Sequence, residues 1–462
     1  MTDVRDQDRP LHRDVRDLST ALGRVIRRIE GEAVFEAVES LRQACRARRR
    51  EEDGAPSLAE LLERVDELPA DTAAQVARAF TLFFLLINTA EQIHRVRRRR
   101  WYARRPDTPP QPGSLEWAFA TLADEGRTAD QVAQALQRLE VSPVLTAHPT
   151  ESTRRTVLAL QARVADLLLA ASDLPEHQRQ TQLEAVEVEV ELLWLTAENR
   201  PDRPHVLDEV STVLWYLETR LAEAGSRVLQ GLDAAFEQAF GRRLGKGPRL
   251  VPGSWVAGDR DGNPFVTPET TIAAARRAKH RMLGRYAEGV EGLVHRLSLS
   301  SRIVDETLAL REGIDAYRPL FPEVDDRNGR RDRDDPMRLF LSFVHARLLA
   351  TRQLVASLDA GERRDDPRAY ANAGELAADL DRVADALDAA DAERTRRSAV
   401  DPLRIELATH GFFGFRMDVR EDSGVHTATV DALCDAAGVG RLDRSGLVTE
   451  LLGRRPLAGP HV

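Results

Sequence analysis

Only three runs of this chain have the composition of buried β-strands: residues 141–146, 250–256 and 412–419. Between them, apolar residues recur every three or four positions, as in 268–297 and 336–358, which predicts long amphipathic helices. Each strand leads into a polar loop, the layout of a (β/α) barrel, whose functional groups gather at the C-terminal ends of its strands. Because closure needs eight strands, the sequence predicts a mainly α-helical fold with a few parallel strands and an incomplete (β/α)8 TIM-type barrel embedded in extra helices.

A histidine follows the first of these strands, in the run VLTAHPTES at residues 144–152. Pro149 has the fixed φ that suits a first helical position and Glu151 suits a first turn, so we expect a helix to begin directly after His148. The positive end of that helix would disfavour an imidazolium, which predicts a neutral His148 that can accept a proton. Capping of the helix is the alternative role for this histidine.

The second strand leads into the loop GSWVAGDRDGNP, residues 253–264. Its glycines permit tight turns, and Asp259 and Arg260 place charged groups in a short segment. A calcium loop is excluded, because Pro264 stands at the position of the required glycine and Thr270 at that of the bidentate glutamate. An internal Asp–Arg pair and direct contact with a substrate both remain open.

The third strand carries FRMDVREDS, residues 415–423. The strand period predicts that Arg416, Asp418 and Arg420 lie on one face. Two arginines around an aspartate could form a buried ion network. They could equally present forked donors to a phosphate or a carboxylate.

A net charge of −9 argues against a general nucleic-acid binder, but residues 94–105, HRVRRRRWYARR, are strongly basic with two interleaved aromatics. The only lysines are Lys246 and Lys279, so arginine supplies nearly every cation and arginine clusters are expected. The basic run is therefore interpreted as a solvated helix end or an internal partner for the many acids, with a polyanion site as the alternative.

Several features predict a cytoplasmic protein without a membrane partner. Cys45 and Cys434 are too few and too far apart in sequence for a disulfide framework, which favours a reducing compartment. The start, MTDVRDQDRP, lacks the apolar core of a signal peptide. The apolar run at 82–87 is too short to suggest a membrane span.

These segments resemble the signatures of the phosphoenolpyruvate carboxylase family, and they occur in that family's order from Leu11 almost to the end of the chain. VLTAHPTES resembles the family's histidine signature. The other similar segments are 77–100 with its Asn-x-Ala-Glu-Gln core at 88–92, GSWVAGDRDGNP at 253–264, FRMDVREDS at 415–423 and, more loosely, WLTAENRPDRP at 194–204.

The resemblance implies carboxylation of phosphoenolpyruvate by bicarbonate to oxaloacetate and phosphate, a carbon-fixing reaction that feeds the tricarboxylic acid cycle. It implies that His148 is the catalytic base that takes the carboxyphosphate proton. It also implies that Arg416, or second Arg420, binds the substrate, beside a loop that contains Asp259 and Arg260. Such chemistry implies Mg²⁺ or Mn²⁺, with ligands outside this sequence and none assigned within it, and the complete enzyme is expected to be a homo-oligomer.

The sequence departs from the family pattern at two positions. Ala257 stands where a glycine is usual, and Ala197 stands where aspartate is common. The second departure weakens the transfer of substrate-binding roles to Glu198, Arg200 and Arg203.

Family members are nearly double this length, and their later half carries Gly-Arg-Gly-Gly motifs that do not occur here. We therefore interpret the chain as the N-terminal half of one catalytic unit, with a helical region at 1–140 and the first barrel strands with helical insertions at 141–462. Alone it is expected to be inactive and to associate through unpaired strand edges. Two alternatives are a non-catalytic helical interaction or regulatory protein and a phosphohistidine transfer protein that uses His148.

Overall fold

The chain forms two compact units. Unit 1 contains Met1–Trp117 and Pro149–Pro204, and unit 2 contains Ala118–His148 and His205–Val462. The computed structural model describes residues 8–105, 108–146, 153–172, 174–197, 205–245, 247–261, 263–304, 307–328, 332, 334–359, 361 and 365–453. Each unit has its own hydrophobic core.

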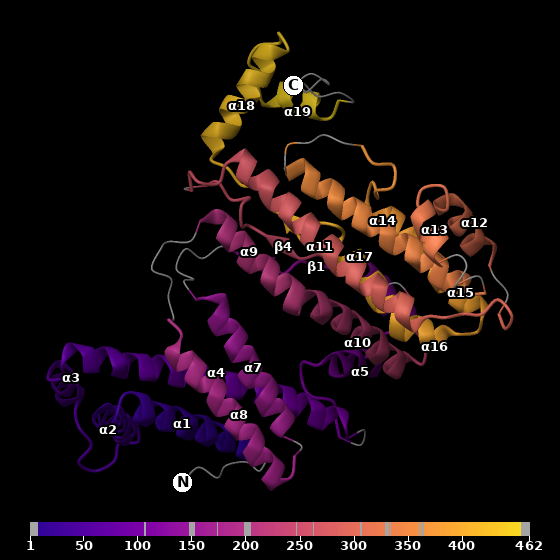
Figure 1. Ribbon diagram of the computed structural model, residues 1–462. Helices are drawn as coiled ribbons and strands as arrows, with labels where there is room; N and C mark the ends of the chain where they lie inside the picture. Colours follow the sequence, from indigo (N-terminus) through magenta and orange to yellow (C-terminus); the bar gives the residue numbers. More distant parts are fainter. Residues whose placement is uncertain are drawn as a thin grey trace. The chain divides into compact units, whose positions relative to one another are not determined.

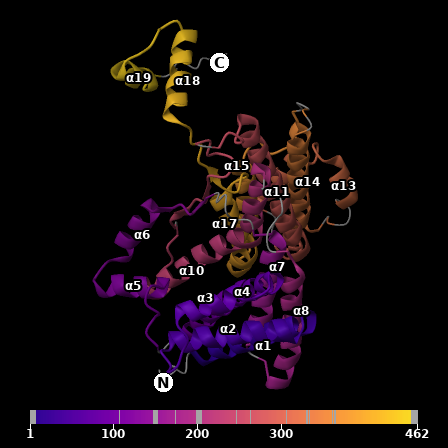
Figure 2. The ribbon, with the colours of Figure 1, turned by 90° about the vertical axis from the view of Figure 1, so that its left-hand side faces the viewer.

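Unit 1 is a helical bundle in which α1, α4, α7 and α8 lie side by side (Figures 1 and 2). Its helices are α1 (Arg9–Ile29), α2 (Glu32–Arg49), α3 (Leu58–Asp66), α4 (Ala70–Ala103), α7 (Arg155–Ala171) and α8 (Glu176–Leu195). Each of the four central helices buries one face, shown in α7 by Val157, Leu160, Val164 and Leu168 at helical spacing. This packing confirms the periodicity read from the sequence.

One glycine divides the first helical segment of unit 1. The apolar spacing over residues 14–50 suggests a single buried face, but the backbone turns at Gly31, whose φ is +91°. A left-handed φ of this kind favours glycine and ends the regular helix. The segment therefore forms two helices, α1 and α2, which contact one another.

Helix α4 corrects the expectation that no run approaches the length of a membrane span. By length and composition alone, α4 is long and apolar enough to cross a membrane. However, Leu82, Leu86 and Ala90 are buried along one face, and the helix packs against α1 and α7. We therefore assign α4 to the core of unit 1.

Unit 2 is organised around two long helices, α11 (Pro268–Arg296) and α14 (Pro336–Asp359), which run alongside one another (Figure 1). Both confirm helices expected from the sequence. The other helical elements of the unit are α5 (Leu115–Asp124), which begins in unit 1, α6 (Ala129–Arg138), α9 (Val206–Tyr216), α10 (Ala222–Phe240), α12 (Leu308–Tyr317), α13 (Pro322–Asn328), α15 (Ala373–Ala389), α16 (Glu393–Thr395), α17 (Asp401–His410), α18 (Ser423–Ala436), α19 (Arg444–Leu451) and the π-helical turns η2 (Leu217–Leu221) and η3 (Arg396–Val400).

The described parts of the charged stretch at 323–336 are packed, although its composition suggests a loop with little to pack. Most of its first half is the short helix α13, in which Val324 is buried. The carboxylate of Asp335 accepts hydrogen bonds from Ser298 Oγ at 2.6 Å and from the backbone N–H of Arg338 at 3.1 Å. The described parts of this stretch therefore pack through the buried side chains of Val324, Asp332 and Asp335.

The three predicted strands are confirmed as parallel neighbours, although each is shorter than expected. The strands are β1 (Glu140–Val141), β2 (Val144–Leu145), β3 (Arg249–Leu250), β4 (Gly253–Ser254) and β5 (Arg416–Met417). β1 and β3 form a two-stranded sheet, and a second sheet has the order β2, β4, β5. In the second sheet, Gly253 lies opposite both Val144 and Arg416. The fold is therefore mainly helical with a few parallel strands.

The third strand starts later than expected because the chain turns at Gly414. Its φ is +79°, and a Cβ atom there would lie 2.3 Å from Leu217 Cδ2. Phe412 and Phe415, whose apolar side chains suggested a strand, instead fill the core of unit 2. Regular pairing consequently begins only at Arg416.

A buried carboxylate joins three helices of unit 2. Asp379, 1% exposed, accepts hydrogen bonds from Tyr317 Oη at 2.7 Å, from Tyr370 Oη at 2.6 Å and from Arg382 Nη1 at 2.7 Å. Arg347 donates in turn to Tyr317 Oη at 2.7 Å. Burial, together with the neighbouring Asp379 carboxylate, raises the pKa of both tyrosines well above the usual value. Both phenols therefore remain protonated donors.

We expect Asp379→Ala to lower the free energy of unfolding by about 3–5 kcal/mol, because it leaves buried donors without their acceptor. Asp385→Ala, an exposed position on the same helix, should change it by no more than about 0.5 kcal/mol. Urea denaturation followed by circular dichroism measures both. Equal, small losses would show that the Asp379 network contributes little to stability.

Candidate functional site

Backbone pairing continues beyond the regular strands and fixes the two polar loops against each other. Arg420 N–H donates to the Gly258 carbonyl at 3.0 Å, and Arg260 N–H donates to the Arg420 carbonyl at 2.9 Å. Asp259 and Arg420 form an isolated parallel bridge. The charged groups that follow β4 and β5 therefore lie beside one another, as expected for the C-terminal ends of neighbouring parallel strands.

The Trp255 side chain contacts two of these charged residues, Arg420 and Asp418. The Arg420 guanidinium lies over the Trp255 ring, 4.5 Å from its centroid, and Trp255 Nε1 donates to Asp418 Oδ2 at 3.1 Å. Arg420 Nη1 also lies 4.0 Å from Asp259 Oδ2. A half-exposed ion pair at that distance is weak, so the aromatic contact is the stronger restraint on Arg420. The guanidinium edge remains able to bind another oxyanion.

Arg260 is held differently. Its Nη2 donates to Thr271 Oγ1 at 3.3 Å, and that hydroxyl donates to the Ala257 carbonyl at 2.7 Å. Its Nε is buried and has no hydrogen-bond partner within the part of the chain that the structure describes. Arg260 is therefore anchored at the first turn of α11 through Thr271.

Arg416 lies apart from the other three predicted substrate-binding residues. Its Nη1 donates to Glu140 Oε1 at 3.3 Å, and Arg249 Nη1 contacts the second oxygen of the same carboxylate at 2.9 Å. The side chain is half exposed. The structure thus brings Asp259, Arg260 and Arg420 together and gives Arg416 a separate partner on β1. The substrate-binding roles of all four remain predictions.

His148, with Glu198, Arg200 and Arg203, lies outside the described residues. The helix expected to start at Pro149 begins instead at Arg155, where α7 first buries an apolar face against its neighbours. The neutral state expected for His148 stays a prediction, because residues 147–152 are outside the described part of the chain.

One flank of the stretch at 147–152 contacts one flank of the stretch at 198–204 within unit 1. Arg154 Nη1 donates to the Ala197 carbonyl at 3.4 Å, and Arg78 Nη2 donates to the Thr196 carbonyl at 2.7 Å. The residue before α7 and the end of α8 are therefore neighbours. These contacts connect two segments that the sequence singled out, 77–100 and 194–204, and place Arg154 beside the second of them.

Two positions in the loop after β4 were not recognised from the sequence as geometric requirements. A Cβ atom on Gly258 would lie 2.4 Å from the Asp418 carbonyl oxygen, so only glycine permits the close approach of the two loops. Ala257 has a φ of +62°, a conformation that costs a residue with a side chain about 1–2 kcal/mol. Ala257 stands where the family commonly has glycine, a residue that adopts this backbone conformation without strain.

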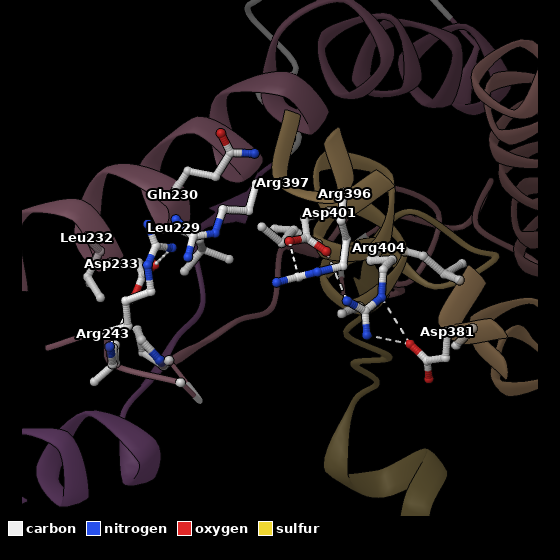
Figure 3. Close-up of a pocket in the computed structure, with 18 of the residues that line it drawn as sticks. Leu229, Gln230, Leu232, Asp233, Arg243, Asp381, Arg396, Arg397, Asp401 and Arg404 are labelled. Atoms are coloured by element: carbon white, nitrogen blue, oxygen red, sulfur yellow. Dashed lines mark hydrogen bonds and ion pairs between the residues drawn. The ribbon is translucent and has the colours of Figure 1, made fainter. Parts of the chain in front are cut away.

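Unit 2 also contains a cavity of about 1000 Å³, lined from α10, η3 and α17 (Figure 3). None of the four predicted substrate-binding residues lines it. Its arginines face carboxylates on its own walls: Arg404 Nη2 lies 2.5 Å from Asp381, and Arg396 Nη1 lies 2.5 Å from Asp401. We therefore place the candidate site at the strand ends.

No cluster of three or more histidine, cysteine or acidic side chains suited to a metal ion occurs among the described residues. Asp259 and Asp418 are both engaged by Trp255 or Arg420. The described site therefore offers arginine donors for an anion and does not assemble a ligand set for a divalent cation.

The structure defines a mainly helical protein in which arginine and aspartate side chains gather where short parallel strands end. The family model for phosphoenolpyruvate carboxylase matches residues 11–462. The chain therefore belongs to the phosphoenolpyruvate carboxylase family.

Proteins named phosphoenolpyruvate carboxylase from three bacteria resemble the chain over nearly its whole length. The Ralstonia nicotianae protein is 37% identical over 94% of this chain and 44% of its own length. The Nocardia farcinica protein is 36% identical over 99% of this chain and 49% of its own length. The Azorhizobium caulinodans protein is 35% identical over 99% of this chain and 50% of its own length. The chain thus spans about half the length of these curated relatives.

We expect Gly258→Ala to lower the free energy of unfolding by about 1–3 kcal/mol, because the new methyl group overlaps the Asp418 carbonyl. Gly292→Ala, on the exposed side of α11 with open space around it, should raise stability by about 0.5–1 kcal/mol. Urea titration of both variants tests the pair. An unchanged free energy of unfolding in Gly258→Ala would mean that the two loops can move apart without loss of stability.

Proposed function

We propose that the chain forms the N-terminal half of a phosphoenolpyruvate carboxylase, which converts phosphoenolpyruvate and bicarbonate to oxaloacetate and phosphate. The observation that carries the proposal is the contact between the Asp259–Arg260 loop and Arg420 at neighbouring strand ends, in segments that match the family in order. Arginines in such a position suit a substrate that bears both a phosphate and a carboxylate.

In the proposed reaction, a bicarbonate oxygen attacks the phosphoryl group of phosphoenolpyruvate, and the enolate of pyruvate leaves. The carboxyphosphate then transfers its proton to His148 and breaks into carbon dioxide and phosphate. The enolate carbon attacks carbon dioxide to give oxaloacetate. Arg416 and Arg420 would hold substrate oxyanions during these steps, since forked donors stabilise charge that is displaced on phosphate oxygens.

Three further proposals accompany this function. The sequential order β2, β4, β5 supports the start of a (β/α) barrel within one catalytic unit, with a helical region at 1–140 and barrel strands with insertions at 141–462. Both cysteines are free thiols, which suits the cytoplasm. We also expect the complete enzyme to be a homo-oligomer that requires Mg²⁺ or Mn²⁺. The metal ligands are expected in the part of the relatives' sequences that this chain does not match.

The first functional prediction concerns His148. We would co-express the chain with the C-terminal half of the Nocardia farcinica relative and measure oxaloacetate by coupled reduction to malate. His148→Asn should abolish oxaloacetate formation, because asparagine cannot accept the carboxyphosphate proton, yet retain bicarbonate-dependent release of phosphate. His177→Asn, an exposed position on α8, should behave as wild type.

Full carboxylation by the His148→Asn variant would remove this histidine from the mechanism. Wild-type chain that yields no oxaloacetate with the complementary half would contradict the proposed activity. Acid-labile phosphate on His148 after exposure to phosphoenolpyruvate would favour a phosphohistidine transfer protein.

The second functional prediction compares two arginines that share the Glu140 carboxylate. Arg416→Lys should lower kcat/KM for phosphoenolpyruvate by about tenfold or more, because an ammonium group cannot replace a bidentate fork. Arg249→Lys removes the other partner of Glu140 and should leave kcat/KM within about twofold. Steady-state kinetics in the same reconstituted system measures both. Equal losses would assign Arg416 to structure.

A further inference from the structure

Unit 1 contains a cavity of about 400 Å³ at the start of α1 and the end of α4. Its walls are rich in arginine. The lining residues include Arg13, Arg97, Arg100, Arg104, Arg105 and Trp101. The cavity lies within unit 1, and its residues have no part in the carboxylation chemistry proposed above.

Helical spacing explains how one run of sequence builds this wall. Arg97, Arg100, Trp101 and Arg104 occupy positions i, i+3, i+4 and i+7 of the α4 segment, so they share one face. Arg99 belongs to the same basic run and is exposed, but it does not line the cavity. The basic run therefore divides into a face that lines the cavity and a face that is solvated.

One of these arginines already has a full set of partners. Arg97 forms an ion pair with Asp14, which is 1% exposed, and its Nε donates to Ser172 Oγ at 2.7 Å. Burial raises the pKa of Asp14, an effect that the hydrogen bond from Arg97 opposes. Arg97 is thus the internal partner of an acid, which was one of the two roles expected for the basic run.

Two other arginines of the wall, Arg13 and Arg100, have no such ion pair among the described residues. Both side chains are exposed, and the charge of Arg13 also opposes the rise in the pKa of Asp14. Arg105 covers the Trp101 ring, with its guanidinium 4.0 Å from the ring centroid. Among the described lining residues there is no carboxylate. The described wall therefore carries two positive charges, at Arg13 and Arg100, that no lining carboxylate pairs.

The cavity in unit 2 shows the opposite arrangement. There Arg243 contacts Asp233 at 2.9 Å, and Arg396 and Arg404 contact wall carboxylates, as Figure 3 shows. A cavity wall of mutually paired charges has little to offer an anion. A wall of like charges, by contrast, repels itself until an anion binds, and a recess with low-dielectric walls concentrates that field.

We propose that the cavity between the start of α1 and the end of α4 binds a small soluble polyanion, a phosphate ester or polycarboxylate. Arg13 and Arg100 would supply its principal ionic contacts. A volume of about 400 Å³ suits a small molecule better than a nucleic acid, and the net charge of −9 opposes a general polyanion surface. The bound anion would link α1 to α4.

Inorganic pyrophosphate is the probe. Isothermal titration calorimetry on the whole chain at low salt should detect binding that weakens as salt is raised. The double variant Arg13→Gln/Arg100→Gln should weaken the affinity at least about tenfold, because two charge-assisted contacts are lost. Arg99→Gln removes one charge from the same helix outside the cavity and should change the affinity by less than about twofold.

If Arg100→Lys keeps the pyrophosphate affinity that Arg100→Gln loses, and both variants have unchanged circular dichroism, the loss of affinity reflects the lost charge and not unfolding. Three results would overturn the proposal: no pyrophosphate binding, equal weakening by Arg99→Gln and Arg100→Gln, or binding only to phosphatidylglycerol vesicles or a DNA duplex. The first would exclude an anion site. The second would indicate diffuse surface attraction, and the third a macromolecular surface.

Discussion

The parallel pairing of the segment around β4 on both of its edges is the constraint on which the rest of unit 2 depends. On one edge, Gly253 and Trp255 donate backbone hydrogen bonds to the carbonyls of Pro143 and Leu145, at 2.8 and 3.0 Å. On the other edge, the Ser254 carbonyl accepts from Asp418 N–H at 3.0 Å. Because parallel neighbours need long crossover connections, the chain must place helices between these three segments. The large helical insertions are thus a consequence of a very small sheet.

The same pairing determines the site. It aligns Gly258 with the Asp418 carbonyl so closely that no side chain fits between them, and it places Arg420 over Trp255. Charged residues that are 161 positions apart in sequence, Asp259 and Arg420, become neighbours through backbone hydrogen bonds and need no strong ion pair of their own. Backbone geometry is therefore the main cause of the charge arrangement at the strand ends.

Sequence periodicity predicted the parts of the fold that depend on local chemistry. The helices at 268–297 and 336–358 have a clear apolar face and begin with proline, and both form as α11 and α14. Helix starts and strand lengths depend instead on distant partners. α7 begins where Val157 first reaches the core of unit 1, and β5 begins only after Gly414 turns the chain past Leu217. Neither contact can be read from the neighbouring residues alone.

The sequence predicted which residues belong to the candidate site, but it did not predict which of them lie together. Alternation along 415–423 suggests that Arg416 and Arg420 share a role, whereas Glu140 holds one and Trp255 the other. The basic run at 94–105 shows the same limitation. Arg97 is paired because of Asp14, which is 83 residues away in sequence. In a chain whose cations are almost all arginine, the informative property of a cluster is therefore the charge that its partners leave uncompensated, and that depends on tertiary packing.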